Sequence, residues 1–84
     1  MEKPFYTKRI IEEHIPLDIA SDELISFVDA AGYLRISKPA VTQAARMGSA
    51  LGVELVTVYH TGKSRERYLM RSAVEAWKAA RKAG

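Results

Sequence analysis

Residues 26–47 contain the pattern of two short helices joined by a tight turn, and this pair limits what the chain can fold into. Ser26 and Ser37 each precede a helical pattern, and each side chain can accept a hydrogen bond from a free first-turn amide. Pro39 is tolerated in the first turn of the second helix because amides there lack partners. Small and apolar residues recur at helical spacing on one face of the first helix, at Ala30, Ala31 and Leu34. The stretch therefore predicts two closely packed helices.

The second helix of this pair carries a polar and basic stripe. Lys38, Thr42 and Arg46 follow one another at intervals of four, with Gln43 beside them. In the major groove of DNA, Arg and Lys pair with guanine and Gln pairs with adenine. The arrangement is typical of a helix-turn-helix, although Arg35 stands where the turn usually has glycine. We expect these four residues to form a recognition helix; the alternative is an ordinary helical hairpin with a solvated polar face.

Charge is distributed unevenly along the 84 residues, a length that suits one domain. Residues 1–24 carry three basic and six acidic side chains, whereas residues 25–84 carry ten basic and four acidic ones. This excess favours a polyanionic partner for the second part. The chain has no cysteine, no apolar run of membrane-spanning length and no signal-peptide pattern. We expect a cytoplasmic protein that associates with the nucleoid when bound to DNA and makes no membrane contact.

The sequence divides into an acidic N-terminal leader, residues 1–23, and a DNA-binding domain, residues 24–84. The segment Phe5–Ile15 suits either a short helix or a strand, and Pro16 interrupts both. The leader could provide extra cover for the core or contact a partner. Its Glu-Glu-His triplet lacks a second histidine one helical turn away, so we expect no metal site and no cofactor.

A basic β-hairpin is expected after the helix pair. Residues 54–60 are rich in β-branched and aromatic side chains, residues 61–64 read as a turn, and residues 65–69 return as a second strand. Such a hairpin can lie on the phosphate backbone or enter the minor groove. The alternative is a charged, solvated loop. The residues expected to contact DNA from this ribbon are Lys63, Ser64, Arg65 and Arg67.

A helix closes the chain, because apolar residues recur at helical spacing between Arg71 and Lys82, with Trp77 as the largest. Trp77 is expected to anchor this helix in the core. The predicted fold class is α+β and mainly helical: a winged helix-turn-helix with a two-stranded wing and a C-terminal closing helix.

Three segments resemble one family. They are VDAAGYLRISKPAVTQAARMG (Val28–Gly48), the ribbon with its basic tip, and RYLMRSAVEAW (Arg67–Trp77). Together they resemble the excisionase-like branch of the MerR-type winged-helix DNA-binding domains. The resemblance covers residues 24–79 and implies a small DNA-binding protein that guides site-specific recombination or regulates transcription on mobile elements. It places Lys38, Thr42, Gln43 and Arg46 on the recognition helix, and Lys63, Ser64 and Arg65 on the wing. Full MerR regulators add a dimerisation helix and a ligand domain that this sequence lacks, so no small-molecule ligand is expected.

The expected function is sequence-specific binding of double-stranded DNA, as an excisionase-like recombination directionality factor or a small transcriptional regulator of a mobile element. An integrase, or further copies of the chain on adjacent DNA sites, are the other expected partners. Two alternatives stay open: a protein-interaction module, and the DNA-recognition subunit of a phage packaging motor. An enzyme is not expected, because no Ser-His-Asp grouping and no phosphate-binding glycine loop is present in the sequence.

Overall fold

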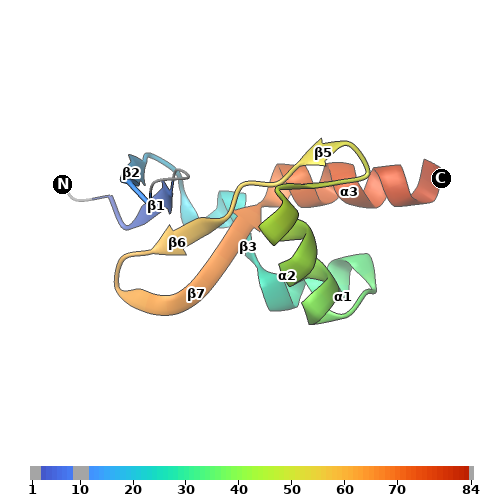
Figure 1. The fold of residues 1–84 in the computed structure, drawn as a ribbon, viewed down its shortest axis with the longest axis horizontal. Coiled ribbons are helices and arrows are strands. Elements are labelled where there is room, and N and C mark those ends of the chain that lie inside the picture. The colour runs from blue at the N-terminus through green and yellow to red at the C-terminus, as the bar shows by residue number, and fades with distance from the viewer. Residues whose placement is uncertain (1–2, 9–11, 84) are drawn as a thin grey trace.

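The computed structural model describes residues 3–8 and 12–83, and the side chains of residues 63–65 lie outside this description. Strands β1, β2 and β6 occupy one end of the molecule, and the helices gather at the other (Figure 1). The elements in chain order are β1 (Phe5–Lys8), β2 (His14–Leu17), a 3-10 turn η1 (Ser21–Glu23), β3 (Leu24–Ser26), α1 (Phe27–Leu34), α2 (Lys38–Met47), β4 (Ser49–Ala50), β5 (Val53–Glu54), β6 (Val58–His60), β7 (Lys63–Met70) and α3 (Arg71–Ala83).

Five of the strands form one antiparallel sheet in the order β2-β1-β6-β7-β3, and β4 pairs with β5 separately. The central pairings join distant parts of the chain: Tyr6 lies opposite Tyr59, and Tyr59 lies opposite Arg67. Pro16 is in β2, an edge strand, where proline is tolerated although it has no backbone N–H to donate. The N-terminal strands are therefore part of the sheet that carries the rest of the fold.

Two hydrophobic clusters lie on opposite faces of this sheet. Successive side chains of a strand point to opposite faces, so β7 contributes Leu69 to one cluster and Tyr68 and Met70 to the other. The smaller cluster centres on Phe5, Leu24 and Val58. The larger one joins the three helices to the sheet, and its buried residues are Ile25, Phe27, Ala30, Ala31, Leu34, Val41, Leu55, Leu69, Val74 and Trp77.

Both helix starts predicted from serine caps are confirmed. Ser26 Oγ accepts a hydrogen bond from the Asp29 amide at 3.1 Å, and Ser37 Oγ accepts one from the Ala40 amide at 3.3 Å. Helix α3 is also present, and Trp77 is 5% exposed within the larger cluster, as expected of an anchor. The local signals of the sequence therefore placed all three helices.

The predicted fold class is wrong. The sequence led us to expect an α+β fold that is mainly helical, a winged helix-turn-helix with a two-stranded wing. Residues 3–8 and 12–83 instead form three α-helices and a five-stranded antiparallel sheet, with a helix last, so the fold is α+β and not mainly helical. The difference arises because the ambiguous N-terminal segment forms β1 and β2, and because β3 pairs with β7. The expected hairpin is thus the centre of a larger sheet.

The strand expected over residues 54–60 is interrupted. Residues 55–57 belong to no strand, and they separate β5 from β6. The Leu55 amide donates to the Gly48 carbonyl at 2.9 Å, and the Leu55 side chain is buried among the helices, whereas Val58 is buried in the smaller cluster. The chain leaves the strand pairing here because it passes from one cluster to the other.

The start of α3 is tied to the segment before α1. Arg71 Nε donates to the Asp22 carbonyl at 3.1 Å, and its Nη2 donates to the Leu24 carbonyl at 3.2 Å. These bonds fix the junction at which β7 runs directly into α3.

No helix within the described part of the chain is long and apolar enough to cross a lipid bilayer.

Candidate nucleic-acid interface

Helix α2 presents its polar stripe to solvent. Val41 is fully buried, so the opposite side of the helix faces solvent. On that side Lys38, Gln43 and Arg46 are exposed, and Thr42 is half-buried. The Thr42 hydroxyl donates to the Lys38 carbonyl at 3.1 Å, so its oxygen remains free to accept. The four residues predicted for the recognition helix therefore share one surface.

A groove separates α2 from the sheet. It has a volume of about 610 Å³, and Thr42 and Arg46 line it from the helix. From the sheet it is lined by Lys8 of β1, Tyr59 of β6 and Arg67 of β7, and the acidic residue Glu12 lines it as well. Three cations from three elements therefore meet around one groove. Because Arg46 and Thr42 belong to the α2 stripe as well, the stripe and the groove form one continuous surface, which we call the α2 surface.

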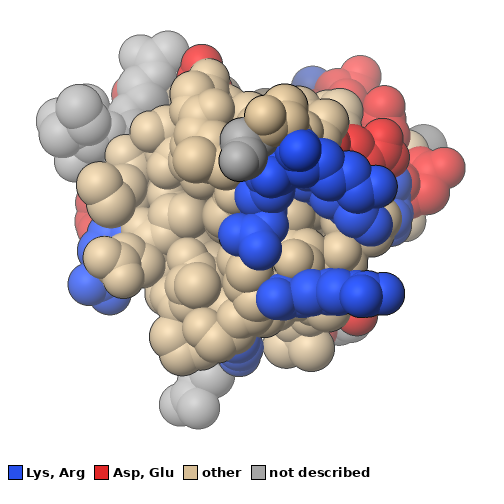
Figure 2. All heavy atoms as spheres, turned by 90° about the vertical axis from the view of Figure 1, so that its right-hand side faces the viewer, with Lys and Arg blue, Asp and Glu red and all other residues tan. Residues whose placement is uncertain are grey.

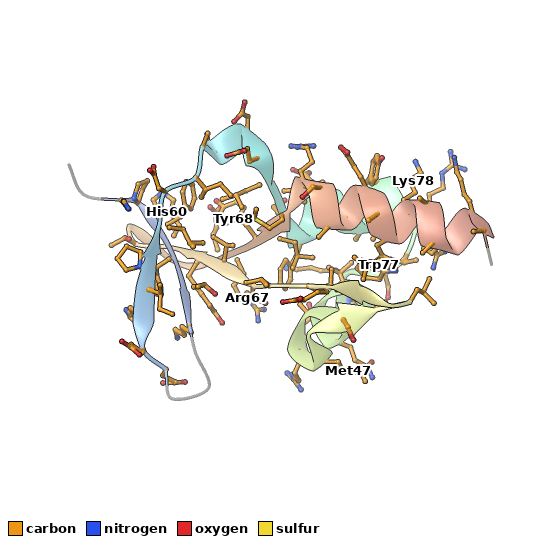
Figure 3. All side chains as sticks on the ribbon, turned by 90° about the horizontal axis from the view of Figure 1, so that it is seen from above. Met47, His60, Arg67, Tyr68, Trp77 and Lys78 are labelled. Atoms are coloured by element: carbon orange, nitrogen blue, oxygen red, sulfur yellow. The ribbon has the colours of Figure 1, made fainter. Side chains whose placement is uncertain are left out.

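The elements that line the groove project from the sheet in a common direction. The β1–β2 hairpin and α2 project to the same side of the β6–β7 ribbon, which lies between them (Figure 3). Arg67 lies on this side of the sheet, while His60 and Tyr68 lie on the other (Figure 3). This placement follows from the alternation of side chains along β6 and β7.

Lys8 is positioned by a row of stacked rings that crosses three strands. Tyr6 stacks on His14 with ring centroids 4.3 Å apart and on Tyr59 with centroids 5.4 Å apart. Lys8 Nζ lies 4.7 Å from the Tyr59 ring centroid, a cation–π contact that holds the ammonium beside the groove. Sequence reasoning missed Lys8 and Tyr59. Alternation within Phe5–Lys8 could have placed Tyr6 and Lys8 on one face, but no local signal identified β6 as the neighbouring strand.

Arg67 lies away from the tip of the hairpin. It is opposite Tyr59 in the sheet, and its guanidinium carbon lies 5.0 Å from the Phe27 ring centroid at the start of α1. A second hollow of about 300 Å³ adjoins it and is lined by Lys38 and Glu66, among others. Arg67 therefore connects the groove to the N-terminal end of α2.

The tip of the hairpin is only partly described. Lys63, Ser64 and Arg65 belong to β7 by their backbone, and their side chains lie outside the described residues. His60 is half-buried: its Nδ1 accepts a hydrogen bond from the Gly62 amide at 2.9 Å, and its ring packs edge-on against Phe5. His60 therefore shapes the turn from the face opposite α2.

Other kinds of site have little support in the described part of the chain. It contains no group of three or more His, Asp or Glu side chains that could hold a metal ion. The Tyr68 hydroxyl donates a hydrogen bond to the Glu66 carboxylate, and this bond, together with burial and the carboxylate charge, raises the pKa of Tyr68 above 10.0. Because Tyr68 belongs to the smaller hydrophobic cluster, we interpret this hydrogen bond as a structural contact of the sheet and not as part of a binding site.

Comparison of the chain with models of protein families, with curated proteins and with solved structures found no match. The class of protein must therefore be argued from the α2 surface.

Proposed function

We propose that this chain is a sequence-specific double-stranded DNA-binding protein that inserts α2 into the major groove. The observation that carries the proposal is the continuity of the α2 surface. Residues able to read bases lie on a capped helix, and cations from the neighbouring strands lie directly beside it.

The dimensions of α2 support this use. Its ten residues span about 15 Å, and an α-helix with side chains, about 10–12 Å across, fits a major groove about 12 Å wide. Arg46 and Lys38 can pair with guanine, and Gln43 can pair with adenine. The described residues that line the exposed side of α2 include no carboxylate that would repel phosphates.

The cations beside α2 suit the DNA backbone. Phosphate contacts fix the position of a protein on the duplex, and base contacts provide specificity. With α2 in the major groove of DNA, we assign Lys8 and Arg67 to phosphates of the DNA strand that flanks this groove. Lys63, Ser64 and Arg65 remain predicted contacts of the same kind, at the far end of the hairpin.

The biological role that we propose is that of an excisionase-like recombination directionality factor or a small transcriptional regulator of a mobile element, acting in the cytoplasm on nucleoid DNA. An integrase, or further copies on adjacent sites, are the proposed partners. This role rests on the resemblance of residues 24–79, and on the α2 surface as the means of binding.

The test is a selection of bound duplexes from a random pool, followed by footprinting on the native locus. We expect one enriched site and strong salt dependence, because Lys and Arg displace counterions from phosphates. With about four to six phosphate contacts at about −0.9 each, the slope of log affinity against log salt should fall between about −3.6 and −5.4. Affinity that does not change with salt would contradict the proposal. A protein that binds no duplex would instead favour a protein-interaction module.

A further inference from the structure

A second basic surface lies at the end of the molecule where α3 finishes, and Lys and Arg side chains gather there (Figure 2). A hollow of about 470 Å³ marks it. Its described lining residues are Tyr33, Leu34, Arg35, Lys78, Arg81 and Lys82, four of them cationic and none of them acidic. We call this the α3-end surface.

The scaffold brings these cations together from two helices. Lys78, Arg81 and Lys82 lie on one side of α3 at intervals of three and four residues. Lys78 Nζ lies 4.1 Å from the Tyr33 ring centroid and so joins α3 to α1. Arg35 closes α1, and its amide donates back to the Gly32 carbonyl at 3.3 Å. The four cations therefore lie on the C-terminal parts of α1 and α3, two helices that pack into the larger hydrophobic cluster.

The α3-end surface and the α2 surface face in different directions. Met47, the last residue of α2, and Lys78 lie on opposite sides of the molecule, with Trp77 between them (Figure 3). A straight duplex on the α2 surface therefore does not reach the α3-end surface. Bending the same duplex around the protein would cost deformation energy. A separate segment of DNA can bind without this cost.

The chemistry of the α3-end surface favours phosphates over a protein partner. Guanidinium groups, here those of Arg35 and Arg81, match phosphate oxygens with two parallel hydrogen bonds. Protein interfaces, in contrast, place apolar side chains at their centre and are depleted of charge there. Of the two apolar residues here, Leu34 is buried in the core, and Tyr33 is 42% exposed and carries the Lys78 ammonium 4.1 Å from its ring centroid.

We propose that Arg35, Lys78, Arg81 and Lys82 form a second phosphate-binding surface that holds a second duplex segment, so that one chain bridges two DNA segments. The inference rests on the proposed function, because the first segment binds at the α2 surface. Bridging would let a single small domain bring together distant sites on one DNA molecule.

The test uses the full chain, a bead-bound duplex that carries the selected site, and a fluorescent random duplex in solution. We expect the protein to retain the fluorescent duplex on the beads. The double variant Arg81→Ala/Lys82→Ala should retain about tenfold less, since two phosphate contacts are lost, while its affinity for a single selected duplex stays unchanged. Lys3→Ala, which removes a positive charge from an exposed residue outside both surfaces, is the control and should bridge like the parent.

The outcomes separate the two proposals. A parent protein that binds single duplexes and does not bridge overturns the inference alone, as does a double variant that bridges normally. Sedimentation of the free proteins identifies the remaining case: if the double variant loses bridging together with self-association, the α3-end surface is a protein interface and the inference is wrong. A parent protein that binds no duplex at all overturns both proposals.

Discussion

Replacing Arg35 by glycine should stabilise the protein while weakening its second DNA contact. Helices α1 and α2 both end in the left-handed conformation, α1 at Arg35 with φ 57° and ψ 46°, and α2 at Gly48 with φ 82° and ψ 3°. An L-residue in this conformation costs about 1 kcal/mol relative to glycine. We therefore expect Arg35→Gly to raise the free energy of unfolding by about 1 kcal/mol, which corresponds to roughly 4–8 °C in Tm for a domain of this size.

Arg35→Ala is the matched control, because it removes the same charge and keeps the strained backbone. The assay is urea unfolding followed by circular dichroism, together with the two-duplex bead assay. Both variants should bridge DNA less well than the parent, and only the glycine variant should be more stable. A glycine variant no more stable than the alanine variant would show that the left-handed conformation of Arg35 imposes no cost, and this reasoning would be refuted.

Two further predictions concern the two hydrophobic clusters. Trp77→Ala should lower the free energy of unfolding by about 3–5 kcal/mol, because it leaves a cavity in the core. The total free energy of unfolding of such a domain is only about 5–15 kcal/mol. A Tm within a degree or two of the parent would show that the ring is not buried. The pKa of Tyr68 is raised in the folded protein, so its hydroxyl contributes stability that is fully present below the unfolded pKa of about 10 and is lost as the pH rises through the folded value. Urea midpoints between pH 8 and pH 11 should therefore fall more steeply for the parent than for Tyr68→Phe, and parallel curves would contradict the assignment.

The helices could be predicted from the sequence because their signals are local. The Ser26 and Ser37 hydroxyl oxygens accept hydrogen bonds from amides three residues further on. The helical spacing of apolar residues that predicts α3 lies within one continuous segment. The stripe of α2 was found for the same reason, since helical periodicity alone places its residues on one face.

The sheet could not be predicted beyond its β6–β7 hairpin, because the strands that pair with this hairpin, β1 and β3, are distant from it in the chain. Phe5 pairs with His60, and the three residues of β3 are too few to show an alternating pattern. The groove was missed together with the sheet: Lys8 enters it only because β1 pairs with β6 and brings Tyr6 onto Tyr59.

The central claim is that α2 reads bases, and the ratio of affinities for the selected site and for random duplex tests it most directly. Arg46→Ala should weaken binding to the selected site by about 1–3 kcal/mol with little effect on random duplex, so that the ratio falls. Lys8→Ala, which removes a proposed phosphate contact, should weaken both and leave the ratio unchanged, and Arg81→Ala should leave the affinity for the selected site unchanged. If Arg46→Ala instead lowers both affinities equally, as Lys8→Ala does, then α2 makes only backbone contacts and the account of sequence-specific binding is contradicted.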